Sequence, residues 1–84
     1  MMPIHELLNR IKWDREFGQA EFVVGYLDRV AGEITRVPLR ELGFEADDHF
    51  AFELTDDTGE LHSIPLHRIK QVYRNGELIW HREH

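Results

Sequence analysis

Short runs that combine cationic, aromatic and histidine side chains are the parts of this sequence best suited to chemistry. The most informative run covers residues 64–70, Ile-Pro-Leu-His-Arg-Ile-Lys, and holds His67, Arg68 and Lys70. Arginine and lysine beside a histidine supply the donors that a phosphate oxyanion requires. Trp80 follows in the sequence and offers a flat face on which a nucleobase can stack. This end of the chain therefore predicts a site for an anionic, phosphate-bearing ligand.

Two further groups carry the same mixture of side chains. They are Lys12, Trp13 and Asp14 at the end of a predicted helix, and Tyr26, Asp28 and Arg29 at the end of a predicted strand. Each group also has a structural interpretation. Because a small domain needs large apolar side chains, Trp13, Tyr26 and Trp80 are expected in the core. Asp28 has Arg29 and Arg68 as candidate partners for a structural ion pair. The sequence leaves open whether the three groups converge on one surface.

The sequence contains none of the common catalytic motifs. It has no cysteine, no glycine-rich phosphate loop and a single serine, Ser63. Adjacent strand residues point to opposite faces, so Ser63 and His62 are not expected to form a nucleophile–base pair. We predict that the protein is not an enzyme and uses no cofactor. The remaining enzymatic alternative is a phosphodiesterase with His62 and His67 as acid and base.

No metal site is expected either. His81 and His84 have the spacing of a metal-binding pair, but they fall at a predicted strand end rather than on a helix. The acidic residues of 45–48 and 56–57 lack the spacing of a calcium-binding loop. A solvated, turn-rich surface is the simpler explanation for these acids.

Charge is distributed unevenly along the chain, whose formal net charge is −6. Residues 41–60 hold eight acidic and no basic residues, residues 1–40 are balanced, and residues 61–84 are net +2. Affinity for a long nucleic acid comes from neutralising many phosphates. The composition therefore argues against an extended nucleic-acid track, while a site for one anionic end remains compatible with it.

Hydrophobic spacing predicts an α+β fold. Ile4, Leu7, Leu8 and Ile11 recur at helical intervals, which predicts a helix over 3–13. Strand patterns follow at 20–27, 34–39, 50–54, 61–66, 69–74 and 78–80, with turn signals at 31–32, 56–59 and 75–76. Leu42 and Phe44 are expected to plug the core. The sum is one N-terminal helix with a small, strongly bent antiparallel sheet or barrel of five to six strands.

Length and composition favour one domain, residues 1–84, in which apolar burial supplies most of the stability because no disulfide is available. No apolar run approaches the roughly 18 residues of a membrane span, and the first residues do not resemble a signal peptide. We predict a cytoplasmic protein without membrane contact, and the oligomeric state stays open.

Four motifs together resemble a known family. They are Leu-Asn-Arg-Ile-Lys-Trp-Asp at 8–14, Tyr-Leu-Asp-Arg at 26–29, Ile-Pro-Leu-His-Arg-Ile at 64–69 and Gly-Glu-Leu-Ile-Trp at 76–80. In this order and at this spacing they resemble the RNA cyclic-group-end recognition domain family, small archaeal and bacterial proteins formerly classed as a domain of unknown function. The resemblance covers nearly the whole chain.

The resemblance implies an RNA-end binding module, involved in RNA processing or repair, that recognises a terminal 2′,3′-cyclic phosphate or another phosphorylated nucleotide terminus. The ligand-binding residues that it implies are Lys12, Trp13, Asp14, Tyr26, Asp28, Arg29, His67 and Arg68. The acidic segment 41–60 lies outside these motifs. The alternative function is a small protein-interaction or structural domain that binds a protein partner through its acidic face or a sheet edge.

Overall fold

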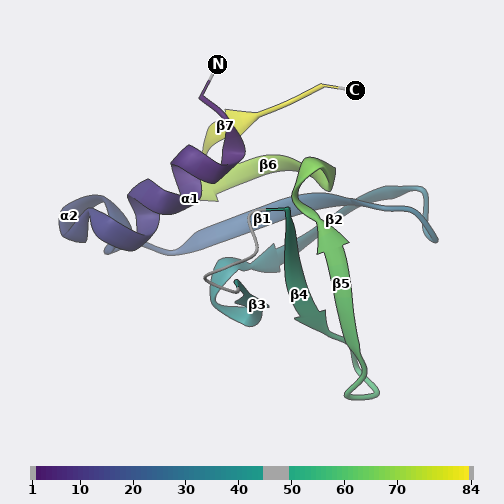
Figure 1. Ribbon diagram of the computed structural model, residues 1–84. Helices are drawn as coiled ribbons and strands as arrows, with labels where there is room; N and C mark the ends of the chain where they lie inside the picture. Colours follow the sequence, from purple (N-terminus) through teal and green to yellow (C-terminus); the bar gives the residue numbers. More distant parts are fainter. Residues whose placement is uncertain (1, 45–49, 84) are drawn as a thin grey trace.

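The described part of the chain folds into one main helix and two antiparallel sheets (Figure 1). The computed structural model describes residues 2–44 and 50–83. None of the described helices has the length and apolar character needed to cross a membrane. The elements, in chain order, are α1 (Ile4–Trp13), α2 (Arg15–Gly18), β1 (Phe22–Asp28), β2 (Glu33–Pro38), η1 (Leu39–Glu41), β3 (Leu42–Gly43), β4 (Ala51–Thr55), β5 (Leu61–Pro65), η2 (Leu66–Arg68), β6 (Ile69–Arg74) and β7 (Glu77–His81).

Helix α1 forms because its apolar residues share one face. Ile4 and Leu7 are buried, and Leu8 and Ile11 pack against the same core. Pro3 precedes the helix in an extended conformation, with the φ of −62° that its ring imposes. The helix is therefore held by one apolar stripe against the rest of the protein.

Asp14 ends α1 and begins α2. Its backbone is extended, with φ −89° and ψ 105°, which interrupts the helical run. Its carboxylate then accepts a hydrogen bond from the Phe17 backbone N–H at 3.1 Å, the usual role of an N-cap residue. The chain consequently turns sharply after Trp13 before it enters β1.

The four-stranded sheet has the order β2-β1-β6-β7, and all neighbouring strands are antiparallel. Val24 in β1 lies between Val37 of β2 and Val72 of β6, and Val72 lies opposite Trp80 of β7. Because directly opposed residues point to the same face, these four side chains form an apolar strip across one face of the sheet. Half of the twelve buried apolar residues in the described chain belong to β1, β6 and β7 of this sheet.

A tight turn at Asn75-Gly76 joins β6 to β7. Both residues have positive φ, 49° and 84°, the combination of a type I′ turn. Asn75 also fixes the start of β1: its backbone N–H donates to the Glu21 carbonyl at 2.7 Å, and its side-chain oxygen accepts from the Glu21 N–H at 2.9 Å. The β6–β7 hairpin is thus locked to the segment that leads into the central strand.

The second sheet, of order β3-β4-β5, packs on the same core and then extends away from α1 (Figure 1). Phe52 in β4 is fully buried, pairs with Ile64 of β5, and meets the ring of Tyr26 edge-on with the centroids 5.8 Å apart. The opposite end of this sheet is the hairpin turn at 56–60, which projects from the molecule. The core therefore lies between the two sheets and α1.

The predicted α+β fold with an N-terminal helix is confirmed, and so is each of the six predicted strand segments, within a few residues. The described strands form two sheets rather than one bent sheet, and they do not close into a barrel. Part of the second sheet was not predicted, because its strand β3 has only two residues and is too short to show periodicity. Leu42 is buried as predicted.

Three aromatic residues expected to be buried are exposed instead. Trp13 is 74% exposed because it follows Ile4 by nine residues, which places it on the face of α1 opposite the apolar stripe. Phe50, 83% exposed, precedes β4 rather than belonging to it. Phe44 is 42% exposed and only partly covers Phe52, with the two ring centroids 6.2 Å apart.

Gly18 is the glycine whose replacement should affect stability most clearly. A β-carbon at this position would collide with the backbone carbonyl oxygen of Ile11, which cannot move aside without disturbing α1. We expect Gly18→Ala to lower the free energy of unfolding by about 1–3 kcal/mol, as overpacking does, measured by urea denaturation. Gly43→Ala is the matched control, because its β-carbon would meet nothing nearer than 3.5 Å. Equal stability of the two variants would contradict this explanation.

Candidate functional site

The structure brings two of the three predicted groups to the same end of the four-stranded sheet. Tyr26 of β1 pairs with Ile69 of β6, and Ile69 directly follows η2, which contains His67 and Arg68. Asp28 ends the same strand, and Arg29 follows it in the β1–β2 turn. The second and third groups therefore lie beside each other, as the single-site hypothesis requires.

The first predicted group lies elsewhere. Lys12, Trp13 and Asp14 are at the end of α1 that adjoins α2, close to where β1 begins (Figure 1). Six residues of β1 separate that point from Asp28, or about 20 Å of extended strand. Asp14 is used as the cap of α2, and the Lys12 ammonium lies 5.1 Å from the Trp13 ring centre. This group does not converge with the other two.

Tyr26 and Asp28 have structural roles in the observed fold. Tyr26 is buried among core residues, so its ring is not available for stacking on a base. Burial raises the pKa of its hydroxyl, and the nearby Asp28 carboxylate adds to that effect. Asp28 accepts hydrogen bonds from the backbone N–H groups of Val30 at 2.9 Å and Ala31 at 3.3 Å, and thereby shapes the β1–β2 turn. Among the described residues it forms no ion pair with Arg29 or Arg68.

Two further cations join the site at this end of the sheet. The backbone N–H of Arg82 donates to the Lys70 carbonyl at 2.9 Å, so Arg82 lies across from Lys70 just beyond the end of β7. We call Arg29, His67, Arg68, Lys70 and Arg82 the basic end. Their side chains make no hydrogen bond or ion pair with any residue in 2–44 or 50–83, so no described residue competes with an external acceptor for their donors.

Arg82 is held in place by an aromatic ring. Its guanidinium carbon lies 5.0 Å from the centre of the Trp80 ring, within the range of a cation–π contact. Its Nε is buried and has no hydrogen-bond partner in the part of the chain that the structure describes. A buried donor without an acceptor costs about 1–3 kcal/mol. An oxyanion that approached this guanidinium would offset some of that cost.

The charge of the basic end is modest. Glu33, which pairs with Asp28, and Glu83, which follows Arg82, are acidic residues at the same end. Asp56, Asp57 and Glu60 lie apart, on the projecting hairpin of the second sheet (Figure 1). Glu45, Asp47 and Asp48 lie outside the described residues. The arrangement suits a ligand with one or two negative charges better than a polyanion.

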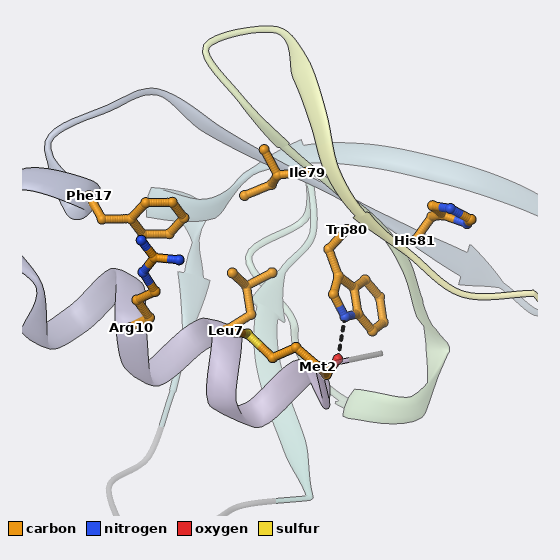
Figure 2. A pocket seen from close by; sticks show the side chains of 7 residues that line it. All are labelled: Met2, Leu7, Arg10, Phe17, Ile79, Trp80 and His81. Carbon is orange, nitrogen blue, oxygen red and sulfur yellow. Dashed lines mark hydrogen bonds between the residues drawn. The ribbon is translucent and has the colours of Figure 1, made fainter.

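A pocket of about 480 Å³ lies between α1 and β7, next to the basic end (Figure 2). Its lining residues are Met2, Leu7, Arg10, Phe17, Ile79, Trp80 and His81. The sequence gives no direct sign of this pocket, because its walls come from opposite ends of the chain. The only local signal is Arg10, which falls three residues after Leu7 and hence beside the apolar stripe of α1.

One cluster among the described residues has the composition of a metal site, namely Asp56, Glu60 and His62, whose ligand atoms lie within 4.8 Å of one another. Asp56 already accepts hydrogen bonds from the Thr58 hydroxyl at 2.6 Å and from His62 Nε2 at 2.6 Å. These hydrogen bonds explain why the three side chains lie close together, since they stabilise the hairpin turn. The predicted pair His81 and His84 cannot be placed, because His84 lies outside the described residues.

The Asp56–His62 pair predicts a pH effect. Hydrogen bonds from Thr58 and then His62 hold the pKa of Asp56 well below its usual range, and the same bond to Asp56 raises the pKa of His62. The histidine contribution to stability is complete below about pH 6.5 and lost as pH rises through the raised pKa. The aspartate contribution is complete above about pH 4 and lost as pH falls through the lowered pKa.

We therefore expect the pair to stabilise the hairpin most between about pH 4 and pH 6.5. An NMR titration should give His62 a pKa above that of an ordinary histidine, and Asp56→Asn should return it to the ordinary value. A His62 pKa that Asp56→Asn does not change would show that the ion pair is absent in solution.

Comparison with known proteins places nearly the whole chain in one family. The family model of the MJ1316 RNA cyclic group end recognition domain matches residues 1–82. UPF0248 protein MmarC6_0667 of Methanococcus maripaludis strain C6 is 32% identical over 80 residues, which cover 92% of this chain and 95% of that protein. UPF0248 protein MmarC5_1387 of strain C5 is 29% identical over the same shares of the two chains. No solved structure is significantly similar.

Proposed function

This chain belongs to the MJ1316 RNA cyclic group end recognition domain family, and from that membership we propose that it is an RNA-end binding module. We propose further that its ligand is a terminal 2′,3′-cyclic phosphate and that the basic end holds it. The observation that carries the proposal is that strand pairing brings the end of β1, the start of β6 with η2 before it, and the residue after β7 to the same end of the four-stranded sheet. The cationic side chains there have no hydrogen-bond or ion-pair partner among the described residues.

The chemistry of the basic end fits a cyclic phosphate. Such a phosphate has one negative charge and two non-bridging oxygens. The planar guanidinium of Arg68 can donate to both oxygens at once, and His67 can supply another donor. The Asp28 carboxylate, which would repel a phosphate, accepts hydrogen bonds from the backbone of the β1–β2 turn. These bonds fix the neighbouring residue, Arg29.

The small number of cations favours recognition of an end over binding along a strand. With two phosphates neutralised, the logarithm of the affinity should fall with the logarithm of the salt concentration with a slope of only about −1.4. The acidic hairpin would oppose a longer track. The specificity in this proposal therefore comes from the shape and charge of the terminal group.

We propose binding rather than catalysis. A phosphodiesterase would need two titratable groups on the same scissile bond, and the two candidates are His62 and His67. His62 lies in β5 bonded to Asp56 at the hairpin, whereas His67 lies in η2 beyond the other end of β5. This separation supports a role for His67 as a phosphate donor.

The proposal predicts which arginine matters for affinity. Arg68→Ala should weaken binding of a short RNA with a 2′,3′-cyclic phosphate by about tenfold to a hundredfold, because a hydrogen bond to a charged group contributes about 1.5–3 kcal/mol. Fluorescence anisotropy should be run in parallel on RNAs ending in cyclic phosphate, 3′-phosphate and hydroxyl.

Lys12→Ala is the matched control, because it removes one exposed cation from the predicted group that lies away from the basic end. It should leave the affinity unchanged. Weak and equal binding of all three RNA ends, with no effect of Arg68→Ala on a variant shown to be folded, would refute the proposed function.

A further inference from the structure

The pocket between α1 and β7 is not used in the proposed binding of a terminal phosphate. Its volume, about 480 Å³, lies within the usual range of small-ligand sites, about 300–1,000 Å³. Figure 2 shows Leu7 and Ile79 facing each other across it, with Phe17 at one end and Trp80 at the other. Such a space is large enough for part of an RNA chain.

Two arginines contact the ring of Phe17, and one of them, Arg10, lines the pocket. The guanidinium carbon of Arg10 lies 4.0 Å from the centre of the Phe17 ring, and that of Arg74 lies 5.0 Å from the same centre. Arg74 is fixed further because its Nε donates to the Phe17 carbonyl at 3.1 Å. Both guanidinium groups are therefore positioned by one ring while most of their N–H donors remain available.

The ion pair with Asp14 balances only part of the charge of Arg10. The contact from Arg10 Nε to an Asp14 oxygen is 3.8 Å, longer than a hydrogen bond, and both side chains are about half exposed. Such an exposed pair contributes little. The Phe17 end of the pocket thus combines an excess of donors with an adjoining apolar surface.

Trp80 connects this pocket to the basic end. One indole forms a wall of the pocket and also carries the guanidinium of Arg82 5.0 Å from its ring centre. Its N–H donates to the Met2 carbonyl at 2.6 Å (Figure 2), so the ring is fixed in orientation. An RNA whose terminal phosphate lies at Arg82 and Arg68 can therefore continue directly into the pocket.

We propose that the pocket is a second RNA subsite, which takes the nucleotides adjoining the terminal one. The apolar walls at Leu7, Ile79 and Trp80 would hold base and ribose, and Arg10 would bind an internal phosphodiester. This inference rests on the proposed function of the basic end and adds a preference for RNA length.

A length series tests the subsite. The probes are a nucleoside 2′,3′-cyclic phosphate and the di-, tri- and hexanucleotides that end in the same group, titrated into the full chain by calorimetry. We expect the affinity to rise by about tenfold between one and three nucleotides, the contribution of one charge-assisted phosphate contact, and to change little beyond that. Arg10→Gln should remove the rise and leave the binding of the mononucleotide unchanged.

Lys12→Gln is the control, because it makes the same change of charge on the same helix outside the pocket, and it should keep the rise. Arg10 is exposed, so the variant is expected to fold, which a thermal melt would check. An affinity independent of length, or a rise that Arg10→Gln retains, would overturn the subsite while Arg68-dependent binding stands. Failure of every probe to bind would overturn the proposed function and the subsite together.

Discussion

The hydrogen bond from the Trp80 indole N–H to the Met2 carbonyl, 2.6 Å long, joins residues 78 positions apart and fixes the last strand against the segment that enters α1. Trp80 is buried and lies opposite Val72, so its large apolar ring anchors β7 to the core. A buried indole N–H needs an acceptor, and loss of that acceptor costs about 1–3 kcal/mol. The same ring positions Arg82 and forms one wall of the α1–β7 pocket, so the arrangement of the candidate site depends on this contact.

The acidic hairpin and the basic end are kept apart by the way in which the two sheets pack on one core. Phe52 of the second sheet is fully buried against the four-stranded sheet, and its strand then leads outwards to the hairpin with Asp56 and Asp57. The cations lie where β1, β6 and β7 meet near η2. An overall charge of −6 therefore coexists with a cluster of donors that have no ion-pair partner within residues 2–44 and 50–83. Distance along the second sheet, rather than pairing with arginines, keeps these acids from the basic end.

Local signals predicted the parts of the fold that local interactions determine. The apolar spacing of α1 and the Asn75-Gly76 turn are examples, since each depends on residues close in sequence. The exposure of Trp13 also follows from local spacing, since the helical period places it opposite the apolar stripe, whereas the expectation of a buried Trp13 came from its residue type alone. The pairing of Tyr26 with Ile69 brings two predicted groups together, and only the strand order of the sheet determines it. The position of Arg82 beside Lys70 and the pocket between α1 and β7 also depend on how the elements pack, so local signals could not predict them.

The most direct test is an NMR titration of ¹⁵N-labelled protein with a trinucleotide that ends in a 2′,3′-cyclic phosphate, with the hydroxyl-ended trinucleotide as the reference. We predict that the backbone amide signals of His67, Arg68, Lys70 and Arg82 shift most with the cyclic phosphate, while those of residues 56–62 stay in place. Shifts confined to the acidic hairpin or to residues 12–14, or identical shifts with both RNAs, would contradict recognition of the RNA end at this site.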